Sequence, residues 1–270
     1  TDEQSNAMKT IGKIAREALQ IFKKYPATIL PFLIMGVMDF VVLCVLYLAP
    51  QRPVSIVLAP PVRAFWGEQY LHYPMNLFLL PKLYSHAHML LLATLGVLAT
   101  GCAIAMIHEA SSAHKPRLFS GFAIAFKRYV SLLIIGLVVF LISFFLGKTS
   151  GKIAMPLLYG TYFFHMVVQI IFLYAMVAVV VNKSNVIRAV KQSFVLARRR
   201  AILTLLIAAM ALILYLPAML LRQNLPLLVK NFFPEIVMVV VSVNIIVTTI
   251  VDVIITFFVT RLFLGQEKQK

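Results

Sequence analysis

The most regular feature of the sequence is a succession of six long apolar stretches, separated by polar or proline-containing connections. Crossing a hydrocarbon layer of about 30 Å takes roughly 20 apolar residues in a helix. The stretches are continuous and do not alternate, which favours helices, and an unpaired strand backbone could not be satisfied in lipid. The sequence therefore predicts six transmembrane helices, at approximately Pro26–Ala49, Ala87–Ile107, Tyr129–Gly147, Leu157–Val181, Ala201–Leu221 and Glu235–Thr260.

Polar segments before the first, third and fifth stretches have the spacing of amphipathic helices. Their apolar stripes run from Ile11 to Tyr25, through Leu118, Phe122, Phe126 and Tyr129, and through Ile187, Val190, Phe194 and Ala197. Basic residues fill the other faces, so we expect three interfacial helices. Because each precedes a pair of apolar stretches, the sequence also predicts a pseudo-three-fold repeat of amphipathic helix plus helix pair, approximately at 8–107, 108–181 and 182–264.

The basic residues are distributed unevenly over the connections. The two ends and the connections after the second and fourth stretches hold 18 Lys and Arg, against seven on the opposite side. By the positive-inside rule, the side with more basic residues faces the cytoplasm. We therefore expect both termini to be cytoplasmic, which agrees with an even number of spans.

Composition excludes a soluble domain. The chain has 270 residues, of which 61% are hydrophobic and 13% charged, and its mean hydropathy is +0.94. Its formal charge of +16 does not indicate nucleic acid, because the basic residues lie between apolar stretches and not on one soluble face. Anionic lipid headgroups are the expected partners. The contacts would be made by Lys23, Lys24, Lys127, Arg128, Arg198, Arg199 and Arg200.

Two segments, one before the first repeat and one inside it, differ in composition from the rest of the chain. Residues 1–7 include Ser-Asn-Ala ahead of Met8 and are interpreted as an expression-tag remnant, which leaves 8–270 as a single membrane domain. The connection at 50–86 is rich in proline and aromatic residues, among them Trp66 and Tyr70. Trp and Tyr favour the headgroup level, so we expect an outer cap there, either an interfacial loop or a lid over a cavity.

Few ionisable or amide side chains fall inside the apolar stretches, where a charge costs at least about 2.5 kcal/mol and usually requires a partner or water. We therefore expect the ionisable and amide side chains inside these stretches to line a cavity or pathway. They are Asp39, His165, Gln169, Asn244 and Asp252. A structural role inside the bundle is the alternative for each. Gly36, Gly96, Gly101 and Gly136 could allow helices to approach closely beside such groups.

Known catalytic and metal-binding patterns are missing from the sequence. His86 and His88 are expected on the outer side, and His108, Glu109 and His114 on the inner side, so neither set supplies the three or four ligands that zinc requires. No phosphate-binding loop and no nucleophile motif is present. We therefore predict no metal, no cofactor and no catalytic residue.

The basic segment GKIAREALQIFKK at 12–24, leading into an apolar stretch, and the segment AVKQSF at 189–194 resemble the YciC-type bacterial inner-membrane proteins. They are also similar to the membrane domain fused to some glycerophosphodiester phosphodiesterases. The resemblance implies the bacterial inner membrane and association with lipid. The soluble phosphodiesterase barrel is absent, so that activity is not implied.

Three functions are compatible with the sequence. The first is transport or lipid handling through a cavity between the helix repeats, with Asp39 and Asp252 lining it. The second is a non-catalytic accessory or scaffold subunit that serves a partner protein through its basic segments. The third is an intramembrane lipid-modifying enzyme, which the small number of ionisable groups in the spans makes the least favoured.

Overall fold

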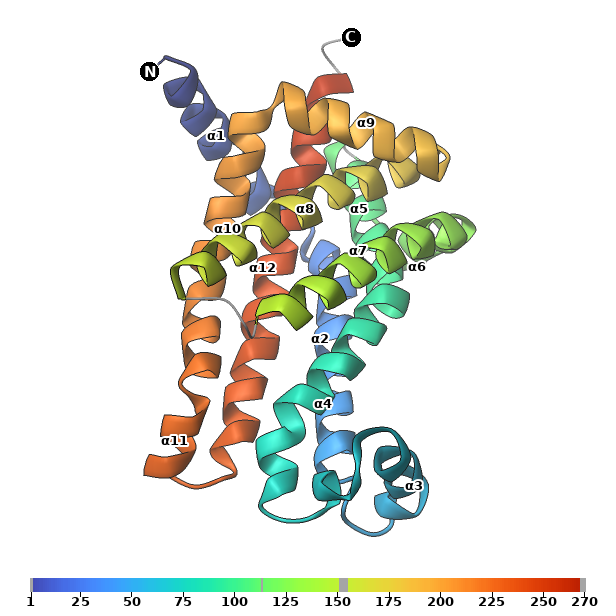
Figure 1. Ribbon diagram of the computed structural model, residues 1–270. Coiled ribbons are helices and arrows are strands. Elements are labelled where there is room, and N and C mark those ends of the chain that lie inside the picture. The colour runs from blue at the N-terminus through green and yellow to red at the C-terminus, as the bar shows by residue number, and fades with distance from the viewer. Residues whose placement is uncertain (1, 113, 151–154, 268–270) are drawn as a thin grey trace. The chain divides into compact units, whose positions relative to one another are not determined.

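The protein is helical throughout the part of the chain that the computed structural model describes, residues 2–112, 114–150 and 155–267 (Figure 1). No strand occurs within these residues. A chain with such long apolar stretches satisfies its backbone hydrogen bonds inside each helix, which is the only way a single segment can do so in lipid. The expected all-helical class is confirmed.

Five helices among the described residues are long and apolar enough to cross a membrane. They are Pro26–Tyr47, Met75–Ser111, Gly160–Val181, Ala201–Gln223 and Ile236–Gly265. A sixth is added if Leu118–Lys127 and Tyr129–Phe145, which meet at 77°, are taken as one bent span. The expectation of six spans therefore agrees with the structure at the level of five or six membrane-length helices.

The chain forms two compact units. Unit 1 comprises Thr1–Leu33, Leu92–Leu214 and Ile250–Lys270, and unit 2 comprises Ile34–Leu91 and Tyr215–Thr249. Three helices contribute to both units: α2 (Leu30–Tyr47), α10 (Ala201–Gln223) and α12 (Ile236–Glu267).

Unit 1 is organised around α5 (Val97–Ser111), whose side chains from Cys102 to Ile107 are buried. The other helices of the unit are α1 (Asp2–Lys24), η1 (Pro26–Ile29), the π-helical turn η3 (Leu92–Gly96), α6 (Leu118–Lys127), α7 (Tyr129–Ser150), α8 (Met155–Val181) and α9 (Val186–Arg199). A Cβ at Gly101 would lie 2.7 Å from Leu132 Cδ1, and one at Gly136 would lie 2.3 Å from Val97 Cγ1. Helices therefore approach closely at Gly101 and Gly136, but against apolar side chains and not beside the polar groups with which the sequence analysis associated these glycines.

The helices α6 and α9 have exposed apolar side chains on their outer faces. Phe119 of α6 is 87% exposed and Ile187 of α9 is 84% exposed, and Phe126 and Phe194 are exposed too. In α9, the face that packs inward carries Ala189, Ser193 and Leu196 instead. The predicted stripe through Ile187 and Phe194 therefore lies on the outer surface of unit 1.

Unit 2 contains α3 (Val54–Trp66), η2 (Glu68–Leu71), α4 (Met75–Leu91) and α11 (Leu225–Asn231). Tyr70 is buried in a small cluster with Val62 and Leu83, and Trp66 packs against that cluster. The two aromatic residues expected in an outer cap thus help to hold α3, η2 and α4 together.

The start of the second membrane-length helix differs from the sequence-based boundary. We expected it at Ala87, but the helix begins at Met75 and continues through Pro81. Proline was taken as a helix breaker, whereas helices with membrane-like packing tolerate it because neighbouring groups satisfy the freed backbone carbonyl. The difference matters for function, since it places His88 well inside the helix and not at its outer end, and it includes Tyr84 in the same helix.

Candidate functional site

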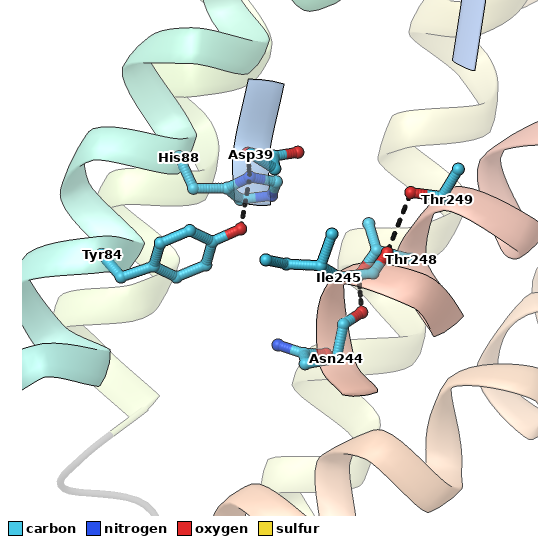
Figure 2. A network of polar contacts seen from close by, with 7 residues as sticks. All are labelled: Asp39, Tyr84, His88, Asn244, Ile245, Thr248 and Thr249. Atoms are coloured by element: carbon cyan, nitrogen blue, oxygen red, sulfur yellow. Dashed lines mark hydrogen bonds and ion pairs between the residues drawn. The ribbon is translucent and has the colours of Figure 1, made fainter. Parts of the chain in front are cut away.

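Three helices of unit 2 bring polar side chains together (Figure 2). Asp39 comes from α2, Tyr84 and His88 from α4, and Asn244 from α12. Tyr84 and His88 are four residues apart, so they share one face of α4. Their rings stack, with centroids 5.5 Å apart and an interplanar angle of 21°.

Asp39 and His88 form the central contact of this site. Asp39 Oδ1 lies 2.6 Å from His88 Nδ1. Asp39 is only 5% exposed, and the His88 side chain is 19% exposed. The Tyr84 hydroxyl oxygen lies 3.5 Å from the same Nδ1 and is directed at the pair. The contact is an ion pair when His88 is protonated and a hydrogen bond donated by Nδ1–H to the carboxylate when it is neutral.

Close packing of α2 against α12 fixes the position of Asp39. Gly36 lies one turn before Asp39, and a Cβ at Gly36 would be 2.9 Å from Thr249 Oγ1. The Thr249 hydroxyl in turn donates to the backbone oxygen of Ile245, at 2.9 Å. Since Gly36 permits this approach, α2 can present Asp39 to the interior of unit 2.

An apolar cluster adjoins the polar site. Tyr84 belongs to this cluster, which also contains Leu43, Leu80, Val229, Val237, Val241 and Ile245. Its members come from α2, α4, α11 and α12. A lone carboxylate beside apolar side chains is costly, so the contact with His88 at 2.6 Å stabilises Asp39 in this position.

A cavity of about 50 Å³ adjoins His88 within unit 2. Its polar lining residues are Tyr84, Ser85, His88, Arg222, Asn244 and Thr248, and its apolar lining residues are Pro81, Leu225, Val240, Val241 and Ile245. The Arg222 side chain is exposed as well as lining the cavity, which places it at the opening. The volume is enough for a few water molecules or a small ion, and far below the roughly 300–1,000 Å³ of sites that hold larger ligands.

The five residues expected to line a pathway are divided between the units. Asp39 and Asn244 both belong to the unit 2 site. His165 Nε2 instead lies 2.7 Å from Ser143 Oγ and 3.5 Å from Gln169 Nε2, within the α7 and α8 pair of unit 1. Asp252 is half-buried in the part of α12 that belongs to unit 1.

The basic residues expected to contact lipid or a partner all belong to unit 1. Lys23, Lys24, Lys127, Arg198 and Arg199 are exposed, whereas Arg128 and Arg200 are half-buried. The Lys24 ammonium lies 5.3 Å from the centre of the Tyr25 ring. Most of these cations are therefore accessible to an external anionic group.

Sequence reasoning missed His88, Tyr84 and Arg222. His88 was considered only as a metal ligand outside the membrane, and no group of three His, Cys, Asp or Glu side chains suited to a metal occurs among the described residues. The sequence feature that could have identified Tyr84 and His88 is their four-residue spacing, which puts both side chains on one face of a helix. It becomes apparent only if that helix is taken to begin at Met75. Arg222 was assigned to an outer connection, and nothing in its sequence context indicates a cavity.

Comparison with known proteins adds no relative: no family model, curated protein or solved structure matches this chain.

Proposed function

We propose that this chain is a multi-pass protein of the bacterial inner membrane that transports a small charged solute, with the Asp39–His88 pair as its charged site. One observation supports this most strongly: a buried carboxylate and imidazole meet at 2.6 Å beside a cavity, in a unit built from helices of membrane length. Ionisable side chains inside membrane-spanning helices are costly, and they are typical of substrate, ion and proton pathways.

The size of the cavity favours a small solute over a lipid at this site. About 50 Å³ holds water or a small ion but excludes an acyl chain or a lipid headgroup. Transport is thus better supported than lipid handling as the role of unit 2. An enzymatic role would use the same side chains, because an imidazole bound to a carboxylate can act as a base or a nucleophile. It is less favoured because a cavity of about 50 Å³ is far smaller than the sites that hold lipid-sized substrates.

Lipid is proposed as the partner of unit 1. The exposed cations at Lys127, Arg198 and Arg199 lie on or beside helices whose exposed faces carry Phe119, Phe126 and Ile187. Aromatic and aliphatic side chains combined with basic ones suit the anionic headgroup region. We further propose that this surface is cytoplasmic, as the distribution of basic residues predicts, and that the three amphipathic segments belong to three repeats of a YciC-type membrane domain.

Electrical measurement of transport tests the proposal. Purified protein would be reconstituted in liposomes on a solid support, and concentration jumps of protons, Na⁺, K⁺, chloride, nitrate and formate would be applied while the current is recorded. We expect at least one jump to give a current above that of protein-free membranes. Asp39→Asn should lower this current about tenfold or more, because tenfold corresponds to only about 1.4 kcal/mol of lost interaction.

His165→Gln is the matched control, because it replaces another half-buried helix histidine that lies outside the unit 2 site. It should leave the current within about twofold of wild type, a difference of less than about 0.5 kcal/mol. The proposal is wrong if no jump in the panel gives a current above protein-free membranes, or if Asp39→Asn and His165→Gln behave alike.

A further inference from the structure

Several polar side chains around the unit 2 cavity can donate hydrogen bonds, and Arg222 carries donors alone. The Asn244 amide offers two N–H groups, and Ser85 offers a hydroxyl. From this lining we infer that the cavity binds a small monovalent anion of the size of chloride, nitrate or formate. The inference rests on the proposed transport function and names its substrate class.

The charge of the lining favours an anion over a cation. Asp39 does not line the cavity, and its carboxylate is engaged by His88 at 2.6 Å. When His88 is protonated, the Asp39–His88 pair is neutral overall and Arg222 supplies the net charge at the opening, so the anion site requires this form of His88. A cation entering the cavity would meet this guanidinium without a free carboxylate to offset it. An anion would be attracted, and the low-dielectric walls would focus the field of Arg222 on it.

The orientation of His88 adds a donor to the same site. Asp39 binds ring nitrogen Nδ1. The other nitrogen, Nε2, is not used by Asp39, and in the protonated imidazole it is a hydrogen-bond donor. His88 lines the cavity, so this donor is available to the same site. Thr248 contributes less, because its hydroxyl already donates to the backbone oxygen of Asn244, at 2.8 Å.

Size and apolar lining restrict which anions fit. A cavity of about 50 Å³ accommodates a halide, nitrate or formate and excludes gluconate, phosphate esters and lipid headgroups. Leu225, Val240, Val241 and Ile245 supply the remaining wall and cannot solvate a strongly hydrated ion. The site therefore favours weakly hydrated, monovalent anions over sulfate or phosphate.

Thermal unfolding of the full chain in detergent tests this site without requiring transport. Potassium chloride, bromide, nitrate or formate would be titrated against potassium gluconate at constant total ionic strength, and the unfolding temperature recorded. A ligand that binds only the folded state raises the unfolding temperature with a saturable dependence on its concentration. We expect this rise for the four small anions, and none for gluconate.

Arg222→Gln should abolish the anion-dependent rise, because it removes the charge at the opening of the cavity. The matched control is Arg63→Gln, since Arg63 is an exposed arginine of unit 2 that pairs with Glu68 at 3.1 Å and does not line the cavity. It should retain the full rise. Ser85→Ala, a smaller change in the lining, should weaken binding of radioactive chloride by several-fold in equilibrium dialysis, as expected for the loss of one hydrogen bond.

The outcomes separate this inference from the proposed function. If chloride stabilises the wild type and Arg222→Gln removes the effect while no ion jump gives a current, the anion site stands and transport is wrong. If proton or cation jumps give Asp39-dependent currents while no small anion raises the unfolding temperature, transport stands and the anion site is overturned. Equal effects of chloride and gluconate, or an unchanged rise in Arg222→Gln, would likewise overturn it.

Discussion

His88 and His165 are two half-buried histidines in long apolar helices. Their hydrogen-bond partners differ, and this difference suggests a functional role for His88 and a structural role for His165. His88 meets the Asp39 carboxylate beside a cavity in unit 2. His165 meets the neutral side chains of Ser143 and Gln169 in unit 1. A carboxylate stabilises an imidazolium, whereas a hydroxyl and an amide do so only weakly. The partner, more than the burial, determines which histidine can hold a charge.

Removal of the Asp39 carboxylate should cause the largest loss in the free energy of unfolding, and it tests whether His88 depends on its partner more than His165 does. Asp39→Ala leaves His88 without its partner in an apolar cluster, so we expect a loss of about 3 kcal/mol in the free energy of unfolding. Asp39→Asn retains a hydrogen-bonding side chain and should cost about 1 kcal/mol. Unfolding of the purified protein by denaturing detergent would measure both.

A double-mutant cycle completes this test. Asp39→Ala combined with His88→Ala should cost less than the sum of the single changes, because neither variant residue leaves a charge unpaired. Additive losses would show that the two side chains act independently, and the comparison with His165 would then lose its basis.

Adding a larger side chain where α2 contacts α12 should cause the next largest loss in the free energy of unfolding. A Cβ at Gly36 would lie 2.9 Å from Thr249 Oγ1, so Gly36→Val would press on Thr249, and overpacking of this kind costs about 1–3 kcal/mol. Thr249→Ala removes the hydroxyl and methyl groups that a valine side chain at position 36 would contact, so Gly36→Val combined with Thr249→Ala should recover part of the lost stability. Gly160→Val is the control, because nothing lies within 4 Å of a Cβ there. An equal loss for Gly160→Val would mean that the close approach at Gly36 is unimportant.

The sequence predicted the helices better than it predicted their contacts. Apolar length alone identifies membrane-length helices, and the glycines at 36, 101 and 136 were correctly associated with close helix approach. Asp39 was recognised because a carboxylate within an apolar stretch is costly wherever it points. These predictions need only local composition, which one sequence supplies.

The rest of the site depends on residues far apart in the chain. Asp39 and His88 are 49 positions apart, and no helical spacing relates them. His88 was also placed outside the membrane, because Pro81 and the neighbouring aromatic residues were interpreted as a loop. Asp252 looked equivalent to Asp39 in sequence, but it belongs to unit 1. Depth along a helix can be estimated from a sequence, whereas the direction a side chain faces requires the packing.

Substitution of His165 should have a smaller effect than substitution of Asp39. His165→Ala removes neutral hydrogen bonds to Ser143 and Gln169, and such contacts between membrane helices are worth about 0.6–1.7 kcal/mol. The same unfolding assay would measure the loss, and Ser143→Ala should give a loss of similar size. A loss as large as that of Asp39→Ala would contradict the distinction between the two histidines.

The smallest expected effect concerns the ion pair that joins α1 to the end of α12. Nε and Nη2 of Arg261 both donate to Oε2 of Glu17, and the two side chains are 20% and 29% exposed. Partial exposure limits the contribution of such a pair to about 1 kcal/mol at most, and salt reduces it. Glu17→Gln should therefore lower the unfolding temperature slightly in dilute buffer and less in concentrated potassium gluconate. Glu68→Gln, which breaks the more exposed pair with Arg63 in unit 2, is the control and should have no measurable effect. If Glu17→Gln proves as costly as Asp39→Ala, then exposure does not rank the charged contacts of this protein, and the buried Asp39–His88 pair has no special standing among them.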